Sequence, residues 1–253
     1  MAVYAGEALI LRTYELAEAD RIVVFLTRER GKRRGVAKGA RRSRSRFRAA
    51  LEPLTLATVE YFEKEQRQLV RLNYVEAQRS PLAIQNPEAM GYVGYFAELL
   101  DEWSADSDPS ERMFRLAASI IEALASQPDV EPVARYFEFW LLRLQGVYPA
   151  ISACHRCGAS LGDGARLTPD DRMLVCLGCG RVSGGLPMSG EAIEFLRRAR
   201  TSSPERMGDV PLIAPARREL EMAHAALIAT HLERELRSTR VLRELRDPTG
   251  PHR

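Results

Sequence analysis

Residues 21–38, RIVVFLTRERGKRRGVAK, decide how the N-terminal part of the chain folds. The β-branched and aromatic run Ile22–Phe25 predicts a strand over Arg21–Thr27. The connection Arg28–Gly31 places a glycine where a hairpin turn needs a positive φ, and Lys32–Lys38 continues as the returning strand. This stretch therefore predicts a β-hairpin.

Three further strands are expected around this hairpin. They cover Glu7–Tyr14, Leu54–Lys64 and Gln68–Ser80, with a charged turn at Lys64–Arg67 between the last two. Five strands within about eighty residues, with no helical period among them, are typical of a small closed barrel or meander. The OB-fold is the leading candidate.

Beyond Ser80-Pro81 the hydrophobic period becomes helical. Asn86 and Pro87 have the residue types of a helix start, and the expected apolar face of that helix is Met90, Val93, Phe96, Leu100 and Trp103. Further helices are expected from Ser110, from Pro132 to Gly146, over Ser189–Arg200 and over Pro215–Leu236. The predicted fold class is α+β: a small OB-type barrel in residues 1–80 and an all-helical domain in residues 81–253.

Four cysteines interrupt the helical part as two close pairs. Cys154 and Cys157 form the first, Cys176 and Cys179 form the second, and eighteen residues separate the pairs. This spacing is typical of a tetrahedral zinc site with four thiolate ligands, in which no position is left for water or substrate. We therefore predict a zinc ribbon over residues 150–184 with one structural Zn²⁺ per chain, which a segment this small needs in order to fold.

The cysteine pattern also permits two alternatives. One Cys-x-x-Cys pair is the pattern of a redox site as well, and free thiols are what a lost metal site leaves behind. His155 lies inside the first pair and is expected at the surface. His224 and His231 share a helical stripe with Leu220 and Leu227, where satisfied core or boundary histidines are commoner than ligands.

Positive charge is concentrated in one segment. Arg28–Arg48 contains eleven lysines and arginines against the single Glu29, a net charge of +10, whereas the remaining 232 residues carry −7. Eighteen consecutive residues from Gly31 to Arg48 contain no acid, which a merely solvated loop would usually include. We predict a DNA-binding surface made by Arg30, Lys32, Arg33, Arg34, Lys38, Arg41, Arg42, Arg44, Arg46 and Arg48.

The chemistry of this segment is that of phosphate recognition. Arginine forks bind phosphate oxygens in bidentate fashion, whereas no helical reader of base edges is evident, so binding independent of sequence is expected. Aromatic residues on the strands either stack on bases or simply fill the barrel, the second being commoner for any one of them. These residues are Phe47, Tyr61, Phe62 and Tyr74.

The sequence contains none of the common motifs of enzymes and no apolar run typical of a membrane protein. The chain has no P-loop, dinucleotide-binding, metalloprotease or Gly-x-Ser-x-Gly motif, and Asp170-Asp171 has the chemistry of a turn, so no enzymatic activity is expected. No apolar run is long enough to cross a bilayer and no signal-peptide pattern begins the chain, so a cytoplasmic protein is expected.

Several segments together resemble the RecO family of bacterial recombination mediators and DNA-repair proteins. The resemblance covers nearly the whole chain. It is carried by Glu18–Asp20, Thr27–Gly31, Lys38–Arg42 with Ser45 and Arg46, Leu51–Pro53, Arg135–Glu138 through Gly146 and Pro149, and His231 with Leu236–Ser238.

The resemblance implies an OB-fold that binds single- and double-stranded DNA, joined to a helical domain that in some members carries a zinc ribbon. It also implies strand annealing, partnership with RecR, contact with the acidic C-terminal tail of the single-strand-binding protein, indirect help in loading RecA, and a location at the nucleoid. Lys38, Arg41, Arg42 and Arg46 match the basic stretch of the family, to which Arg44 and Arg48 are additions.

Two competing hypotheses remain. An RNA-binding or translation-associated OB-fold protein has the same composition. A zinc-dependent nuclease or deaminase is the enzymatic alternative, although a closed site of four sulfurs leaves no room for a reacting water.

Overall fold

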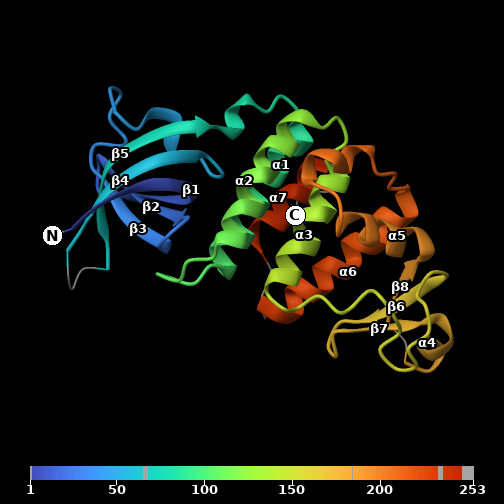
Figure 1. The fold of residues 1–253 in the computed structure, drawn as a ribbon. Coiled ribbons are helices and arrows are strands. Elements are labelled where there is room, and N and C mark those ends of the chain that lie inside the picture. Colours follow the sequence, from blue (N-terminus) through green and yellow to red (C-terminus); the bar gives the residue numbers. More distant parts are fainter. Residues whose placement is uncertain (1, 65–67, 184, 233–235, 247–253) are drawn as a thin grey trace. The chain divides into compact units, whose positions relative to one another are not determined.

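Five strands form a closed barrel at the N-terminal end of the chain, in the order β1-β2-β3-β5-β4 (Figure 1). The structure is a computed structural model that describes residues 2–64, 68–183, 185–232 and 236–246. The strands are β1 (Ala2–Leu16), β2 (Asp20–Thr27), β3 (Gly31–Ala37), β4 (Leu56–Glu63) and β5 (Val70–Arg79). All pairs are antiparallel except β3 with β5, and this order is the one expected of an OB-type barrel.

Strand β1 is longer than its apolar run predicts because it pairs with two strands, β4 and β2. Its first half pairs with β4, from Ala2 opposite Glu63 to Leu9 opposite Leu56, and its second half pairs with β2. The register shifts between Ile10 and Arg12 on the β2 side, an irregularity of the kind that bends a strand around a barrel.

The barrel interior is filled by small and medium side chains with three aromatic rings. Phe25, Phe47 and Tyr61 are all nearly inaccessible, and the short helix η1 (Arg48–Leu51) adds Ala50 and Leu51 to the same cluster. Phe47 and Tyr61 therefore fill the barrel, which excludes them as exposed stacking platforms. The predicted turn at Lys64–Arg67 falls largely on residues 65–67, which lie outside the described residues.

Helices follow the barrel. They are η2 (Pro81–Ala83), α1 (Pro87–Trp103), α2 (Glu111–Ser126), α3 (Glu131–Leu144), α4 (Leu177–Ser183), α5 (Gly190–Ala199), η3 (Pro204–Asp209), α6 (Ala214–Leu232) and α7 (Arg237–Arg246). The three short strands β6 (Gly164–Thr168), β7 (Met173–Cys176) and β8 (Leu186–Ser189) form a separate sheet in the order β7-β6-β8. The predicted α+β class, a barrel followed by helices with a cysteine-bearing insertion, is confirmed.

The chain divides into two compact units. One comprises Met1–Ile121 together with the segment that begins at Leu236, and the other comprises Glu122–Glu235. Helix α1 starts as expected, because the Asn86 side chain accepts hydrogen bonds from the backbone N–H groups of Glu88 and Ala89. Within the first unit α1 packs against both α7 and β1.

Two details of the helix predictions are wrong. Met90, predicted in the apolar face of α1, is exposed, and Tyr92, Tyr95 and Leu99 are buried instead. The helix predicted over Pro215–Leu236 does not include Leu236, which precedes a separate helix, α7, that begins at Arg237; α6 is described as far as Leu232, and residues 233–235 lie outside the described residues. The Glu98 carboxylate accepts hydrogen bonds from the backbone N–H groups of Arg237 and Ser238, which caps the new helix.

The second unit contains a buried polar network. Glu138 of α3 accepts a hydrogen bond from His224 of α6, with 2.8 Å between Oε2 and Nδ1, and forms an ion pair with Arg135 at 3.2 Å. The Tyr148 hydroxyl lies 3.2 Å from the other ring nitrogen of His224. His224 is thus a satisfied core residue, as predicted, whereas His231 is exposed. Among the described residues, no helix is long and apolar enough to cross a membrane.

Candidate nucleic-acid interface and cysteine cluster

The turn of the basic hairpin is fixed by Thr27 and Gly31. Gly31 has φ +68°, and Thr27 Oγ1 donates to the Gly31 carbonyl at 2.9 Å and accepts from the Arg30 N–H at 3.1 Å. The predicted hairpin with its positive-φ glycine is confirmed. This turn sends the basic residues of β3 back along the barrel.

The cations of the turn and of β3 are largely engaged inside the first unit. Lys32 is buried, and its Nζ donates to the Asp101 carbonyl oxygen at 2.6 Å and to Asp101 Oδ1 at 3.3 Å. Arg34 lies 3.8 Å from the Asp106 carboxylate, and the Arg33 guanidinium donates to the Ser107 hydroxyl. The guanidinium carbon of Arg30 lies 3.7 Å from the centre of the Tyr4 ring.

The loop after β3 is held by hydrogen bonds of its backbone, whereas the residues of β3 are held by contacts of their side chains. The Gly39 N–H donates to Asp20 Oδ1 at 2.8 Å, and the Arg41 N–H donates to the Ala19 carbonyl at 3.0 Å. These contacts fix the backbone of the loop, and its basic side chains are exposed to solvent. Lys38, Arg41, Arg42, Arg44 and Arg46 are all exposed.

Most of these exposed cations are not neutralised by the protein. Arg41 pairs with Glu15 at 3.2 Å, and Arg46 lies 4.9 Å from the centre of the Phe47 ring. Within the described part of the chain, no acidic side chain pairs with Lys38, Arg42 or Arg44. The Arg48 side chain lies outside the described part. We call Lys38, Arg41, Arg42, Arg44 and Arg46 the basic loop.

Nine of the ten predicted DNA-binding residues thus fall into two groups, and the side chain of the tenth, Arg48, lies outside the described part of the chain. Arg30, Lys32, Arg33 and Arg34 make contacts inside the first unit, and the basic loop presents its charges outward. The sequence does not distinguish the groups, because the acidic partners of Lys32 and Arg34 come from residues 101–106, far along the chain.

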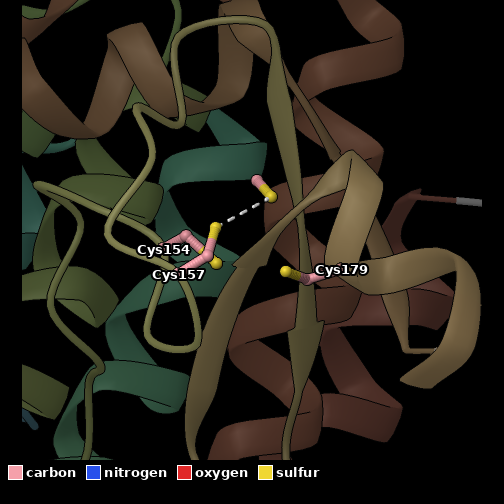
Figure 2. Close-up of side chains that lie close together, drawn as sticks. Cys154, Cys157 and Cys179 are labelled. Carbon is pink, nitrogen blue, oxygen red and sulfur yellow. Dashed lines mark hydrogen bonds between the residues drawn. The ribbon is translucent and has the colours of Figure 1, made fainter.

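The four cysteines lie together in the second unit. Their sulfur atoms all lie within 4.8 Å of one another, and none forms a disulfide. Figure 2 shows the side chains of Cys154, Cys157 and Cys179 converging. Cys154 and Cys157 come from the segment before β6, Cys176 ends β7, and Cys179 lies in α4.

Local structure accounts for this convergence. Strands β6 and β7 pair as a hairpin across the Asp170-Asp171 turn, as predicted, and Gly158 with φ +73° turns the chain after the first pair. The second pair spans the end of a strand and the first turn of a short helix. His155 is exposed and is not part of the cluster.

The donor set fits a metal ion. Backbone N–H groups of Cys176, Cys157 and Arg156 hydrogen-bond to the Cys154 sulfur and lower the pKa of Cys154 to about 6, which favours a thiolate. Hydrogen bonds with Cys157 and Cys176 raise the pKa of Cys179 to about 12. Four clustered thiols therefore resist complete ionisation unless a cation supplies the compensating charge.

The spacing of the sulfur atoms also suits a tetrahedral ion. A Zn–S bond of about 2.3 Å implies about 3.8 Å between neighbouring sulfurs of a tetrahedron. Cys157 Sγ and Cys176 Sγ lie 3.7 Å apart. The cluster is therefore compatible with zinc, and the predicted set of four ligands is brought together.

The class of protein that the fold and the site define is an OB-type barrel with an exposed basic loop, followed by helices that carry a four-cysteine cluster compatible with a metal ion. The family model described as "Recombination protein O N terminal" matches residues 1–81, and "Recombination protein O C terminal" matches residues 84–240. The chain belongs to the recombination protein O (RecO) family.

Curated relatives agree with this assignment. The chain is 35% identical over 240 residues to the DNA repair protein RecO of Anaeromyxobacter sp. (strain K), covering 94% of each chain. It is 34% identical over 244 residues to the DNA repair protein RecO of Koribacter versatilis (strain Ellin345), covering 95% of this chain and 98% of the relative. For the DNA repair protein RecO of Geobacter metallireducens the identity is 35%, with 94% and 96% covered.

Proposed function

We propose that this protein is a non-enzymatic mediator of DNA repair and homologous recombination. It binds single- and double-stranded DNA without sequence specificity and anneals complementary strands. Together with RecR it helps RecA load onto DNA coated by the single-strand-binding protein, whose acidic C-terminal tail it contacts. It acts in the cytoplasm, at the nucleoid. Membership of the RecO family supports this role.

The observation that carries the DNA-binding proposal is the basic loop. Five exposed cations lie within nine residues, and the backbone contacts of Gly39 and Arg41 hold their main chain in place. Guanidinium groups bind phosphate oxygens and leave base edges unread, so one loop serves any sequence. Because the contacts are to the backbone, bases stay free to pair.

Annealing follows from the same charges. Two complementary strands repel each other through their phosphates, and cations that bind both strands lower this repulsion and hold the strands close. Such a function requires no catalytic group. Contact with a coat protein would raise the effective concentration of coated strands at the basic loop.

We further propose that the cysteine cluster holds one structural Zn²⁺. Cys154, Cys157, Cys176 and Cys179 would supply all four ligands, and the ion would supply the charge that stabilises four thiolates. The convergence of the four sulfurs within 4.8 Å supports this assignment. The ion would join the segment before β6 to β7 and α4, a region with a small core of its own.

A strand-annealing assay tests the proposal. Complementary oligonucleotides are mixed with the protein, with and without a single-strand-binding protein, and duplex formation is followed by fluorescence. We expect faster annealing in both cases and comparable binding to every sequence of equal length. Strong preference for RNA without any acceleration of annealing would contradict the proposal, and so would turnover of DNA that depends on the metal.

A further inference from the structure

A cavity of about 670 Å³ opens on the barrel at the end of β4 and the beginning of β5. Its lining comes from β3, β4, β5 and the segments that flank them. The lining residues are Val36, Lys38, Phe62, Lys64, Gln68, Leu69, Val70 and Arg71. This volume lies in the range of small-molecule sites and is large enough for a nucleotide.

Strand register explains the outer wall of this cavity. Val36 of β3 pairs with Arg71 of β5, and Arg71 pairs with Phe62 of β4. Their neighbours Ala37, Leu72 and Tyr61 are buried in the barrel core. Because side chains alternate along a strand, Val36, Arg71 and Phe62 lie in one row on the outer surface.

The cavity combines apolar surface with positive charge. Phe62 is half-buried and Leu69 keeps 37% of its surface exposed. Lys38, Lys64 and Arg71 line the same cavity, and within the described part of the chain none of the three pairs with an acidic side chain. The three cations do not match a purely apolar ligand, and the aromatic ring does not match inorganic phosphate. The lining therefore fits a ligand that has both an apolar ring and negative charge.

Three more cavities on the described surface differ in charge. One near the barrel hairpin includes Glu7 and Glu29, one beside α5 includes Glu191 and Glu194, and one along α1 includes Glu98 and Asp101. Among the described residues that line the cavity at Phe62, none is acidic. A polyanion is therefore favoured there.

We propose that this cavity binds one unpaired nucleotide of a DNA strand, with its base against Phe62 and its flanking phosphates on Lys38, Lys64 and Arg71. The inference rests on the proposed DNA-binding function and adds a preference for single strands. Lys38 belongs to both the cavity and the basic loop, so a strand that follows the loop reaches the cavity directly. A base in a duplex is stacked on both faces and does not meet the ring.

The test compares Phe62→Leu with Tyr74→Leu. Tyr74 lies on β5, is 45% exposed, and does not line the cavity, so it is a matched aromatic control. Affinities for a single-stranded oligonucleotide and its duplex are measured at one salt concentration. We expect Phe62→Leu to weaken single-strand binding about 10-fold with duplex binding nearly unchanged, and Tyr74→Leu to change neither.

An oligonucleotide of abasic sites shows whether the ring contacts a base. We expect the wild type and Phe62→Leu to bind this backbone with equal affinity, because the group that stacks is missing. An equal loss on normal and abasic strands, or no loss on either, would overturn the inference. Thermal unfolding of each variant verifies that it is folded.

The charged half of the site has its own readout. The double variant Lys64→Gln/Arg71→Gln removes two cations from the cavity. The log–log slope of its single-strand affinity against salt concentration should be shallower than that of the wild type by about 1.4, the contribution of two phosphates. Failure of the inference leaves wild-type DNA binding and its dependence on the basic loop intact. Failure of the proposed function abolishes DNA binding by the wild type itself.

Discussion

Lys32 Nζ lies 2.6 Å from the carbonyl oxygen of Asp101 and 3.3 Å from its carboxylate, so a cation from the most basic segment of the chain is used inside the first unit. Arg12 approaches the same carboxylate at 3.6 Å. The Lys32 and Asp101 side chains are only 9% and 11% exposed. Charge in a sequence and charge at a surface are therefore different quantities here.

Lys32→Met is predicted to lower the free energy of unfolding by about 3 kcal/mol, because it leaves a largely buried carboxylate with one partner fewer. Denaturant titration measures this change. At temperatures where the variant is folded, its DNA affinity should match that of the wild type.

The control for Lys32→Met is Lys38→Met, which removes the same charge from the exposed end of the hairpin. This variant should keep its stability and lose DNA affinity. If Lys32→Met instead weakened DNA binding at unchanged stability, the internal role of Lys32 would be wrong.

Cys176→Ser is predicted to abolish zinc binding, since a hydroxyl is a poor replacement for the thiolate in a four-sulfur site. Metal analysis of the purified protein measures the loss. The ribbon should also become sensitive to trypsin, whereas the barrel should keep its DNA affinity.

His155→Ala is the matched control for the cysteine variant, because His155 is exposed inside the first cysteine pair and is not part of the cluster. It should retain one zinc per chain. A full equivalent of zinc in Cys176→Ser would contradict ligation by four sulfurs.

Acid is predicted to destabilise the second unit through His224. Burial lowers the pKa of His224 below its usual value, although Glu138 opposes this shift. The unfolded chain then binds a proton that the folded chain does not. The free energy of unfolding should fall as the pH drops below about 6.5, by up to about 1.4 kcal/mol per pH unit.

Chemical denaturation between pH 7.5 and 5.5 measures this dependence. The groups that face the imidazole are Glu138, Arg135 and Tyr148. In His224→Gln the slope should be smaller than in the wild type. Identical slopes in the two proteins would show that His224 does not take up the proton.

Local signals are sufficient to predict much of the fold. The hairpin at Gly31, the cap at Asn86 and the pairing of β6 with β7 all depend on neighbouring residues. The four-cysteine cluster is also predictable, because its spacing in the sequence reflects ligand geometry. In each case the deciding interaction lies within a short stretch of chain or a known spacing.

Features that depend on distant residues are not predictable in this way. Helix α7 is capped by Glu98, more than a hundred residues earlier in the chain. The partner of Lys32 comes from α1, and the cavity at Phe62 exists only once β3 pairs with β5. A periodicity argument contains no information about such partners, which is why the prediction that Met90 lies in the core is wrong.

The salt dependence of single-strand affinity tests most directly whether the basic loop binds DNA through the phosphates of the strand. The comparison is between wild type and a variant with Arg41, Arg42, Arg44 and Arg46 changed to alanine. A control with equal net charge changes four exposed arginines elsewhere, Arg112, Arg200, Arg206 and Arg218.

For the wild type we predict a log–log slope of about −3 to −4, and for the loop variant a weaker affinity with a slope shallower by about 2. The control variant should keep nearly the wild-type slope, and thermal stability should be similar in all three proteins. An unchanged affinity and slope in the loop variant would contradict the account.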